Sequence, residues 1–321
     1  MADKLWRSIY DCAVTIYFAQ LPHRGALLID GPDRSKFLQG QTTCDVSAVT
    51  AKTAVQGAYC TPQGRLVCDF RILHDTEDSW LLQMDRGICA HAAAAFGKYI
   101  VFSKAEITDA SDQWTSFAVW TDTPGEWASG WGLNGQWQDG HSRWVQTDAK
   151  GQRFECLVPA AHAAELQAAL AAEMTQATAE EWQLLEISAG IGHVETATIE
   201  EFIPQMLNYQ LTGHISFTKG CYTGQEVVAR MHYRGKLKRP MYLASLGQTS
   251  PPAAGTPLYA AGTEQSIGNI VNAAALGDGC LVLAVITTKA LDGGVHLSDP
   301  AGPLLALGKL PYSLGDTDSE E

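Results

Sequence analysis

The sequence predicts an α+β protein that ends in an all-β part, and three observations lead to this class. Strand-like and helical segments mix over the first hundred residues without a strict alternation. Two more helices are predicted between residues 160 and 192. After Arg239 only short strands follow, split by glycine and proline, which is typical of a small all-β barrel. With 321 residues the chain is too long for one core, so two or three domains are expected.

The elements of the first hundred residues follow from their apolar runs and turns. Residues 12–19, CAVTIYFA, predict a strand, because eight residues make a poor signal-peptide core. The turn TPQG, residues 61–64, separates two apolar runs and predicts a β-hairpin. The other predicted elements are strands at 25–30 and 79–84, a short helix within 31–40 and an alanine-rich helix at 86–100. Strands that follow one another over short turns should pair antiparallel.

The middle of the chain is rich in tryptophan. Residues 112–144 contain six of the nine tryptophans, separated by glycine and asparagine. An aromatic platform for a ligand is one interpretation; strands and turns of a second small domain is the favoured one. A strand at 153–159 follows, then helices at 160–174 and 179–192, the second ended by Gly190 and Gly192.

Composition narrows the classes of function. The net charge of −13 argues against non-specific binding to nucleic acid or an anionic membrane. The eight cysteines show no C-x-x-C spacing and no small disulfide scaffold, and no run has the length of a membrane span. We therefore expect a cytoplasmic protein without a membrane partner. His74, His91 and His193 show no metal-ligand spacing and are interpreted as ordinary strand, helix and loop residues.

Residues 219–230, KGCYTGQEVVAR, carry the clearest chemical pattern. Gly220 and Gly224 allow backbone conformations closed to other residues, which predicts a tight turn before a helix that begins near Gln225. A thiol near a helix N-terminus and close to Lys219 is favoured as the thiolate, the form that attacks disulfides and binds metals. A cysteine that only positions the helix is the alternative, and local composition leaves both open.

The string K-G-C-Y-T-G-Q-E with Arg230 resembles the signature of the folate-binding YgfZ family, bacterial relatives of a mitochondrial factor that helps to mature iron–sulfur proteins. Further segments are similar to the same family, and together they cover roughly residues 25 to 246, with a weaker likeness in the β-rich tail. They are FIPQMLNYQLTGHISFTKGCYTGQEVVAR (202–230), IDGPDRSKFLQGQTTCDV (29–46), TPQGRLVCDF (61–70) and EWQLLEISAGIGHV (181–194).

The resemblance implies an architecture, because this family is similar to the T-protein of the glycine cleavage system, a tetrahydrofolate-dependent aminomethyltransferase. Two α+β domains would surround a central folate pocket and a β-barrel would follow. The implied domains are 1–105 plus 185–235, which is discontinuous and carries the signature, then 106–184, and then the barrel at 236–315. Residues 316–321 form an acidic tail that composition predicts to be disordered.

The resemblance also implies the residues of the pocket, with tetrahydrofolate or a derivative as ligand and no stably bound metal. Trp182 lies where the family has its folate-contacting tryptophan; the alternative is a core residue of an amphipathic helix. Arg24 stands where some members carry a second tryptophan, and its guanidinium can also stack on a flat ring. Asp69 matches the second acid of the transferase's acidic pair, whereas Cys68 replaces the first.

Residues 230–239, RMHYRGKLKR, form a basic segment in an acidic chain. It is predicted to contact a polyglutamate tail, RNA or a partner protein, or to be a solvated hinge before the barrel.

The leading hypothesis is a folate-binding protein that supports assembly or repair of iron–sulfur clusters in client enzymes and so influences tRNA modification indirectly. Cys221 would be the functional thiol, Lys219 would tune its charge, and Glu226 would pair with Arg230. The signature residues assigned to this site are Lys219, Gly220, Cys221, Tyr222, Gly224, Gln225, Glu226 and Arg230. Iron–sulfur clients or scaffolds would be the partners. The alternatives are a folate-dependent one-carbon transferase or demethylase that uses Asp69, and a tRNA-binding module. The replacement of the first acid by Cys68 counts against aminomethyltransferase activity.

Overall fold

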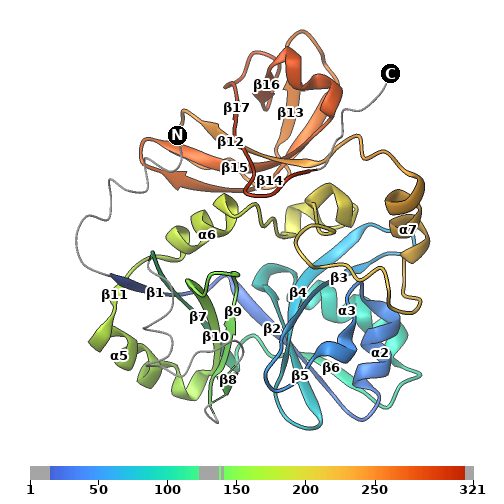
Figure 1. Cartoon of the computed structure of the whole chain (residues 1–321), viewed down its shortest axis with the longest axis vertical. Helices are drawn as coiled ribbons and strands as arrows, with labels where there is room; N and C mark the ends of the chain where they lie inside the picture. The colour runs from blue at the N-terminus through green and yellow to red at the C-terminus, as the bar shows by residue number, and fades with distance from the viewer. Residues whose placement is uncertain (1–14, 123–136, 139–140, 315–321) are drawn as a thin grey trace.

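The computed structural model describes residues 15–122, 137–138 and 141–314. Their strands form three β-sheets, which confirms the α+β class (Figure 1). The predicted acidic tail and Trp127 and Trp131 lie outside the described residues. Among the helices that are described, none combines the length and the apolar composition that crossing a bilayer requires.

The first sheet has five strands in the order β3-β4-β5-β2-β6, and all of its pairs are antiparallel. The predicted hairpin is confirmed, because β3 and β4 pair on either side of residues 61–64. Two helices accompany this sheet. The bounds are β2 Arg24–Asp30, β3 Val55–Cys60, β4 Leu66–His74, β5 Ser79–Asp85, β6 Glu106–Asp109, α2 Arg34–Gln41 and α3 Cys89–Ile100.

The second sheet has six strands in the order β11-β1-β7-β10-β9-β8. Strand β1 pairs with β7 and β11, so the first described strand belongs to this sheet and not to the one that contains β2. The interpretation of the tryptophan-rich part as strands is confirmed for β7 and β9, where Trp120 and Trp144 are buried. The bounds are β1 Ile16–Gln20, β7 Trp114–Thr121, β8 Trp137–Gln138, β9 Arg143–Gln146, β10 Arg153–Pro159 and β11 Thr175–Gln176.

Two helices follow β10, one on either side of the short strand β11, and both are shorter than predicted. The alanine-rich run after residue 159 begins as a 3-10 turn, η3 (Ala160–His162), before α5 (Ala163–Glu173). Helix α6 (Ala179–Ser188) starts with a capping box between Thr178 and Glu181. It ends before Gly190, whose positive φ of 70° leaves the helical conformation.

The third sheet has six strands in the order β16-β13-β14-β15-β12-β17. Strands β16 and β17 are its edges and do not pair with each other in the described part of the chain, so closure into a barrel stays a prediction. The bounds are β12 Met241–Leu246, β13 Pro257–Ala260, β14 Ser266–Leu276, β15 Gly279–Ile286, β16 Val295–Leu297 and β17 Ala306–Leu307. Helix α7 (Gln225–Arg234) precedes it. The remaining 3-10 turns are η1 Val46–Ala48, η2 Arg86–Ile88, η4 Thr196–Thr198, η5 Pro204–Leu207 and η6 Thr288–Gly293.

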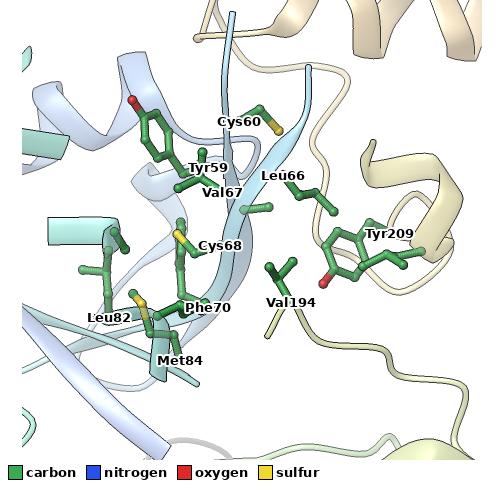
Figure 2. Close-up of a cluster of buried hydrophobic side chains, with 14 of the residues drawn as sticks. Tyr59, Cys60, Leu66, Val67, Cys68, Phe70, Leu82, Met84, Val194 and Tyr209 are labelled. Atoms are coloured by element: carbon green, nitrogen blue, oxygen red, sulfur yellow. The ribbon is translucent and has the colours of Figure 1, made fainter. Parts of the chain in front are cut away.

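The largest core joins the first sheet to the third. Figure 2 shows its centre, where side chains of β3 and β4 meet Val194 and Tyr209 from the later segment. Leu184 and Ile187 of α6 belong to the same cluster, as do Met241 and Val285 of the third sheet. Helix α6 therefore lies where the three sheets approach one another (Figure 1), which makes it the natural place for a shared site.

Candidate functional site

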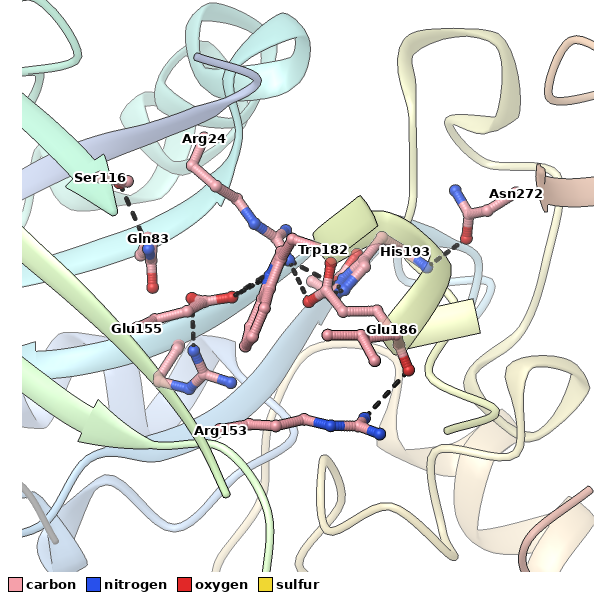
Figure 3. A network of polar contacts seen from close by, with 12 residues as sticks. Arg24, Gln83, Ser116, Arg153, Glu155, Trp182, Glu186, His193 and Asn272 are labelled. Carbon is pink, nitrogen blue, oxygen red and sulfur yellow. Dashed lines mark hydrogen bonds and ion pairs between the residues drawn. The ribbon is translucent and has the colours of Figure 1, made fainter. Parts of the chain in front are cut away.

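A buried network of charged side chains lies where α6 faces the first and second sheets (Figure 3). Arg24, the first residue of β2, donates from Nη2 to Glu186 Oε1 of α6 at 2.5 Å. The same nitrogen is 3.6 Å from Glu155 Oε1 of β10. Burial of a guanidinium is stable only when it is paired, and these two carboxylates provide the pairing. The guanidinium of Arg24 is thus already paired with two carboxylates of the protein.

His193 connects Arg24 to Asp69. Its Nδ1 is 2.6 Å from Asp69 Oδ2 and its Nε2 is 3.2 Å from Glu186 Oε1. Burial and the nearby Arg24 oppose a charge on the ring, but the two carboxylates outweigh both and raise the pKa of His193 to about 9. At neutral pH both ring nitrogens are therefore protonated and donate to the two carboxylates, so that Nε2 and Arg24 Nη2, which are 3.1 Å apart, both donate to Glu186 Oε1. His193 lies in a loop as interpreted, but the expectation that it is an ordinary loop residue was wrong, because it joins two halves of the site.

Asp69 is held on β4 with both oxygens occupied. Oδ1 accepts from the Val194 amide at 2.7 Å, and Oδ2 faces His193. Burial opposes its charge, but His193 and these hydrogen bonds keep the pKa of Asp69 below its usual value. Side chains alternate along a strand, so the neighbouring Cys68 faces the apolar core, where burial raises its pKa well above the ordinary value.

Glu155 brings Trp182 into the same network. One oxygen accepts from Trp182 Nε1 at 3.1 Å, and the other accepts from Arg71 Nη1 at 2.8 Å. We call the whole set the Arg24 network. Its cations (Arg24, Arg71 and the protonated His193) balance its anions (Asp69, Glu155 and Glu186), and Trp182 closes one side.

A cavity of about 190 Å³ adjoins this network and is here called the network cavity. Its walls come from β2, α6, the 191–195 segment and β14 of the third sheet. Asp85 and Glu195 line it, and burial raises the pKa of both carboxyl groups. Neither forms an ion pair with any described residue. The lining residues are His23, Arg24, Asp85, Gln183, Glu186, Ile187, Ile191, His193, Glu195, Asn272 and Ala273.

The structure brings together the three residues that the resemblance assigned to a pocket. Arg24, Asp69 and Trp182 come from β2, β4 and α6, and they meet through His193 and Glu155. The Trp182 side chain is only 1% exposed, and its ring lies 5.7 Å from that of Trp120 in an apolar cluster. It is therefore a core residue whose polar edge reaches the network, which also satisfies the alternative interpretation of a core-facing helix position.

The residues that sequence reasoning missed are Glu155, Glu186 and His193. Glu155 is a charged residue inside the apolar strand RFECLVP, and Glu186 is one inside the apolar stretch LLEIS. A charge within a buried element is itself a signal, because it demands a partner. His193 carries no such local signal.

The predicted Cys221 site lies elsewhere, on a loop of residues 219–224 before α7, which we call the Cys221 loop. The helix begins at Gln225 as predicted, and Cys221 is exposed. Lys219 does not reach toward the thiol in any described contact. Its Nζ donates to the carbonyls of Gln39, Thr42 and Cys44 at 2.8, 2.6 and 2.7 Å, and burial lowers its pKa to about 8. Lys219 thus ties the loop to the end of α2.

The other signature residues divide between structure and surface. Gly224 has φ +82°, and a Cβ there would lie 2.5 Å from the Thr61 carbonyl oxygen, so this glycine is required. Gly220 has neither a positive φ nor a close neighbour, so the prediction of a special backbone there was wrong. Tyr222 is buried beside Lys219, whose ammonium lies 5.1 Å from the ring centre. Glu226 pairs with Arg230 at 3.0 Å as predicted, with both side chains exposed.

One hairpin links the two regions. The turn between β3 and β4 packs against α7, because Gly64 faces Val227 and Gly224 faces Thr61. Asp69 lies on the same hairpin, roughly 15 Å farther along β4 at about 3.3 Å per residue. The Cys221 loop and the Arg24 network are thus separate sites on one structural element.

The basic segment, residues 230–239, continues from α7 toward β12, and its charged side chains are largely exposed. Among the described residues, no cluster of three or more histidine, cysteine, aspartate or glutamate side chains could hold a metal ion.

Comparisons with known proteins show which family this chain belongs to. No family model matches it. The tRNA-modifying protein YgfZ of Serratia proteamaculans is 33% identical over 303 residues, which cover 90% of each chain. The protein of the same name from Yersinia pseudotuberculosis is 32% identical with the same coverage. Among solved structures, the glycine cleavage system aminomethyltransferase T from Bartonella henselae superposes with a TM-score of 0.69 at 14% identity. That match covers 92% of this chain and 86% of the other, and it shows a shared fold. The identity and coverage of the curated relatives show that this chain belongs to the YgfZ family.

Proposed function

We propose that this protein binds a tetrahydrofolate and supports assembly or repair of iron–sulfur clusters in client enzymes, through which tRNA modification depends on it. Membership of the YgfZ family supports the link to tRNA, since the curated relatives are named tRNA-modifying proteins. Folate and clusters enter through the resemblance of the signature at 219–230 to that family. A cytoplasmic location is part of the same proposal.

The observation that carries the proposal is the convergence of Arg24, Asp69 and Trp182 in one buried network, which adjoins the network cavity through Arg24, Glu186 and His193. A reduced pterin ring is flat and carries several N–H donors. Asp85 and Glu195 line the cavity as carboxyl groups without a cationic partner among the described residues, and such groups accept from N–H donors. His23 Nε2 is also buried and has no hydrogen-bond partner in the described part of the chain, and burial lowers the pKa of this ring to about 4, so it is neutral. These residues fit a donor-rich ring.

Each part of the site has a distinct role in this proposal. Glu195 and Asp85 orient the ring by accepting its N–H groups. The Arg24 network, whose charges balance, holds the cavity walls without repelling the ligand's acidic tail. Asn272, which donates to Glu195 Oε1 at 2.6 Å, fixes that carboxylate in place. Bound folate supplies one-carbon chemistry or a redox-active ring to this cavity.

Cys221 is assigned a separate role as the functional thiol. It is exposed and belongs to a loop that Lys219 and Gly224 hold in place. Iron–sulfur clusters usually take four protein ligands, so one cysteine serves as a transient ligand or redox group at a contact with a client or scaffold. An exposed position suits such a contact.

The finer architecture is also part of the proposal. Domains of residues 1–105 plus 185–235, 106–184 and 236–315 would surround the folate pocket, with β1 paired in the sheet of the second domain and β6 in the sheet of the first, and the third sheet would act as a barrel. The superposition with the aminomethyltransferase supports the arrangement at the level of the fold.

A one-carbon transferase or demethylase that uses Asp69 as charge partner is the second candidate. Both oxygens of Asp69 already accept hydrogen bonds, from His193 and Val194, which disfavours a direct role toward a folate nitrogen. Turnover of methyl- or formyl-tetrahydrofolate that disappears in Asp69→Asn would favour this candidate.

Folate binding can be tested with a substitution that fills the network cavity with a larger side chain and leaves every charged residue in place. Ala273 of β14 lines the cavity, and Ala275, two residues farther on the same strand, is exposed. Ala273→Phe should abolish the saturable change in tryptophan fluorescence on anaerobic titration with tetrahydrofolate, whereas Ala275→Phe should bind like wild type. Cys221→Ala should also bind normally.

The possible results separate the two halves of the proposal. Equal binding by both phenylalanine variants would place folate outside this cavity, and no binding by wild type would remove folate altogether. Normal complementation by Cys221→Ala in a strain that lacks the protein would refute the thiol role while leaving folate binding intact.

A further inference from the structure

A second cavity, of about 380 Å³, lies at the C-terminal end of α7, and we call it the α7 cavity. Gln205 of η5 and the nearby Asn208 and Gln210 form one wall, while His232 and Lys236 belong to another. Small-molecule pockets usually span about 300–1,000 Å³, so the volume is sufficient for a small ligand. None of its lining residues belongs to the network cavity.

Three amide oxygens in this wall have no hydrogen-bond partner among the described residues. Gln205 Nε2 donates to the Val228 carbonyl at 2.7 Å, and Asn208 Nδ2 donates to the Met241 carbonyl at 2.9 Å. Only the nitrogen of an amide can donate to a carbonyl, so these two bonds fix which atom is the oxygen in Gln205 and in Asn208. Gln205 Oε1, Asn208 Oδ1 and Gln210 Oε1 are buried without a hydrogen-bond partner in the described structure. Buried acceptors are nearly always paired, so three beside one cavity indicate a ligand that donates.

Positive charge and flat rings lie beside the same cavity. Lys236 lines it, and Arg234 and Lys238, two positions before and after Lys236 in the chain, are exposed in a protein whose net charge is −13. His232 stacks on Phe217 with ring centres 3.7 Å apart, and Tyr233 is 68% exposed. Cations together with accessible aromatic rings are the features with which proteins bind single-stranded nucleic acid.

We propose that the α7 cavity binds one nucleotide of a single-stranded RNA. Exocyclic amino groups of the base supply the donors that the amide oxygens lack, and phosphates pair with the cations of the basic segment. The basic segment carries more cations than one phosphate requires, which favours a strand over a free mononucleotide. This site is independent of the folate proposal and goes beyond it.

The first experiment tests the phosphate contact by fluorescence anisotropy with a labelled single-stranded RNA. Lys236→Gln should weaken binding about tenfold and reduce the slope of log K against log salt by about 1. Lys52→Gln removes the same charge from an exposed lysine in the first sheet's 50–53 turn and should leave binding unchanged. Equal weakening by both variants would attribute binding to overall charge and overturn the site.

The second experiment tests the reading of the base. Oligo-A carries exocyclic amino groups and oligo-U carries none, so wild type should prefer oligo-A. Gln210→Leu changes a partly exposed side chain and should remove that preference at an unchanged melting temperature. If Gln210→Leu keeps the preference for oligo-A, the proposal is overturned. It is also overturned if adenosine monophosphate binds to wild type as tightly as oligo-A does. Absence of RNA binding with intact tetrahydrofolate binding would refute this site alone.

Discussion

The Arg24 network and the Cys221 loop are stabilised by opposite means. The network is buried, and its ion pairs join residues that are far apart in the chain, with Arg24 and Glu186 separated by 162 positions. The loop exposes its thiol and is held by backbone carbonyls and by the left-handed conformation of Gly224. An enclosed polar site suits a small molecule, whereas an exposed thiol suits contact with another macromolecule. The stability of the fold should therefore depend on the Arg24 network, whereas chemistry with a partner should depend on the Cys221 loop.

The largest expected effect contrasts two glutamates, each on a helix and each paired with an arginine. Glu186→Gln should lower the free energy of unfolding by about 3 kcal/mol, because it leaves Arg24 and His193 buried with one carboxylate fewer. Glu226→Gln breaks the exposed pair with Arg230 and should cost less than about 0.5 kcal/mol. Urea denaturation of both variants measures the difference, and similar losses would contradict the contrast.

The next effect depends on pH. The pKa of His193 is raised from 6.5 to about 9 in the folded protein, so its stabilising contribution is complete below pH 6.5 and is lost as pH rises through 9. The stability difference between wild type and His193→Gln should therefore shrink, by an amount on the order of 2 kcal/mol, between pH 7 and pH 10. Thermal unfolding over this range measures it.

Comparing wild type with His193→Gln cancels the contributions of other groups that titrate in the same pH range. Lys219, whose pKa burial lowers to about 8, acts in the opposite direction but is present in both proteins. His91→Gln changes an exposed histidine on α3 and is the matched control. A constant difference across the range would mean that His193 is not charged in the network. On the acid side, the lowered pKa of Asp69 predicts stability that is present above pH 4 and lost as pH falls further.

A smaller effect tests how the Cys221 loop is held. Gly224→Ala should destabilise the protein by about 1–2 kcal/mol, because alanine disfavours φ +82° and its Cβ would meet the Thr61 carbonyl. Gly220→Ala should be nearly neutral, since nothing lies within 4 Å of its Cβ position. Melting temperatures of the two variants distinguish these outcomes. An equal loss at Gly220 would show that the loop is more constrained than its contacts indicate.

The smallest expected effect on stability accompanies the largest expected effect on function. Cys221→Ser should change the free energy of unfolding by less than about 0.5 kcal/mol, because the side chain is exposed. The same variant should lose complementation, measured by the thiolated nucleosides of cellular tRNA. Cys280 is a buried cysteine in the third sheet and provides the counterpart. Cys280→Ser should lower the free energy of unfolding but keep complementation. Marked unfolding of Cys221→Ser would remove the distinction between the two regions.

Local rules predicted much of the fold. The TPQG turn gave the β3–β4 hairpin, the glycine before Gln225 gave the start of α7, and the spacing of Glu226 and Arg230 gave their ion pair. Each of these depends on residues that are close in sequence. The convergence of Arg24, Asp69 and Trp182 was expected only from the family resemblance.

The remaining features depend on contacts between distant segments. His193 lies 124 positions from Asp69, and no local pattern indicates that they meet. The placement of β1 in the second sheet follows from its pairing with β7, almost a hundred residues later. Lys219 was predicted to act on its neighbour Cys221, yet its ammonium reaches the carbonyls at the end of α2, 175 or more positions away.

The composition of the Arg24 network also has a consequence for synthesis on the ribosome. Arg24, Asp69 and Arg71 emerge long before Glu155, Glu186 and His193. Until those partners arrive, burying the early charges would leave them uncompensated, so that face of the nascent first sheet must remain hydrated. The sheet therefore acquires its final packing only after the second sheet and α6 have been made. Completion of the site thus marks a late step in folding during translation.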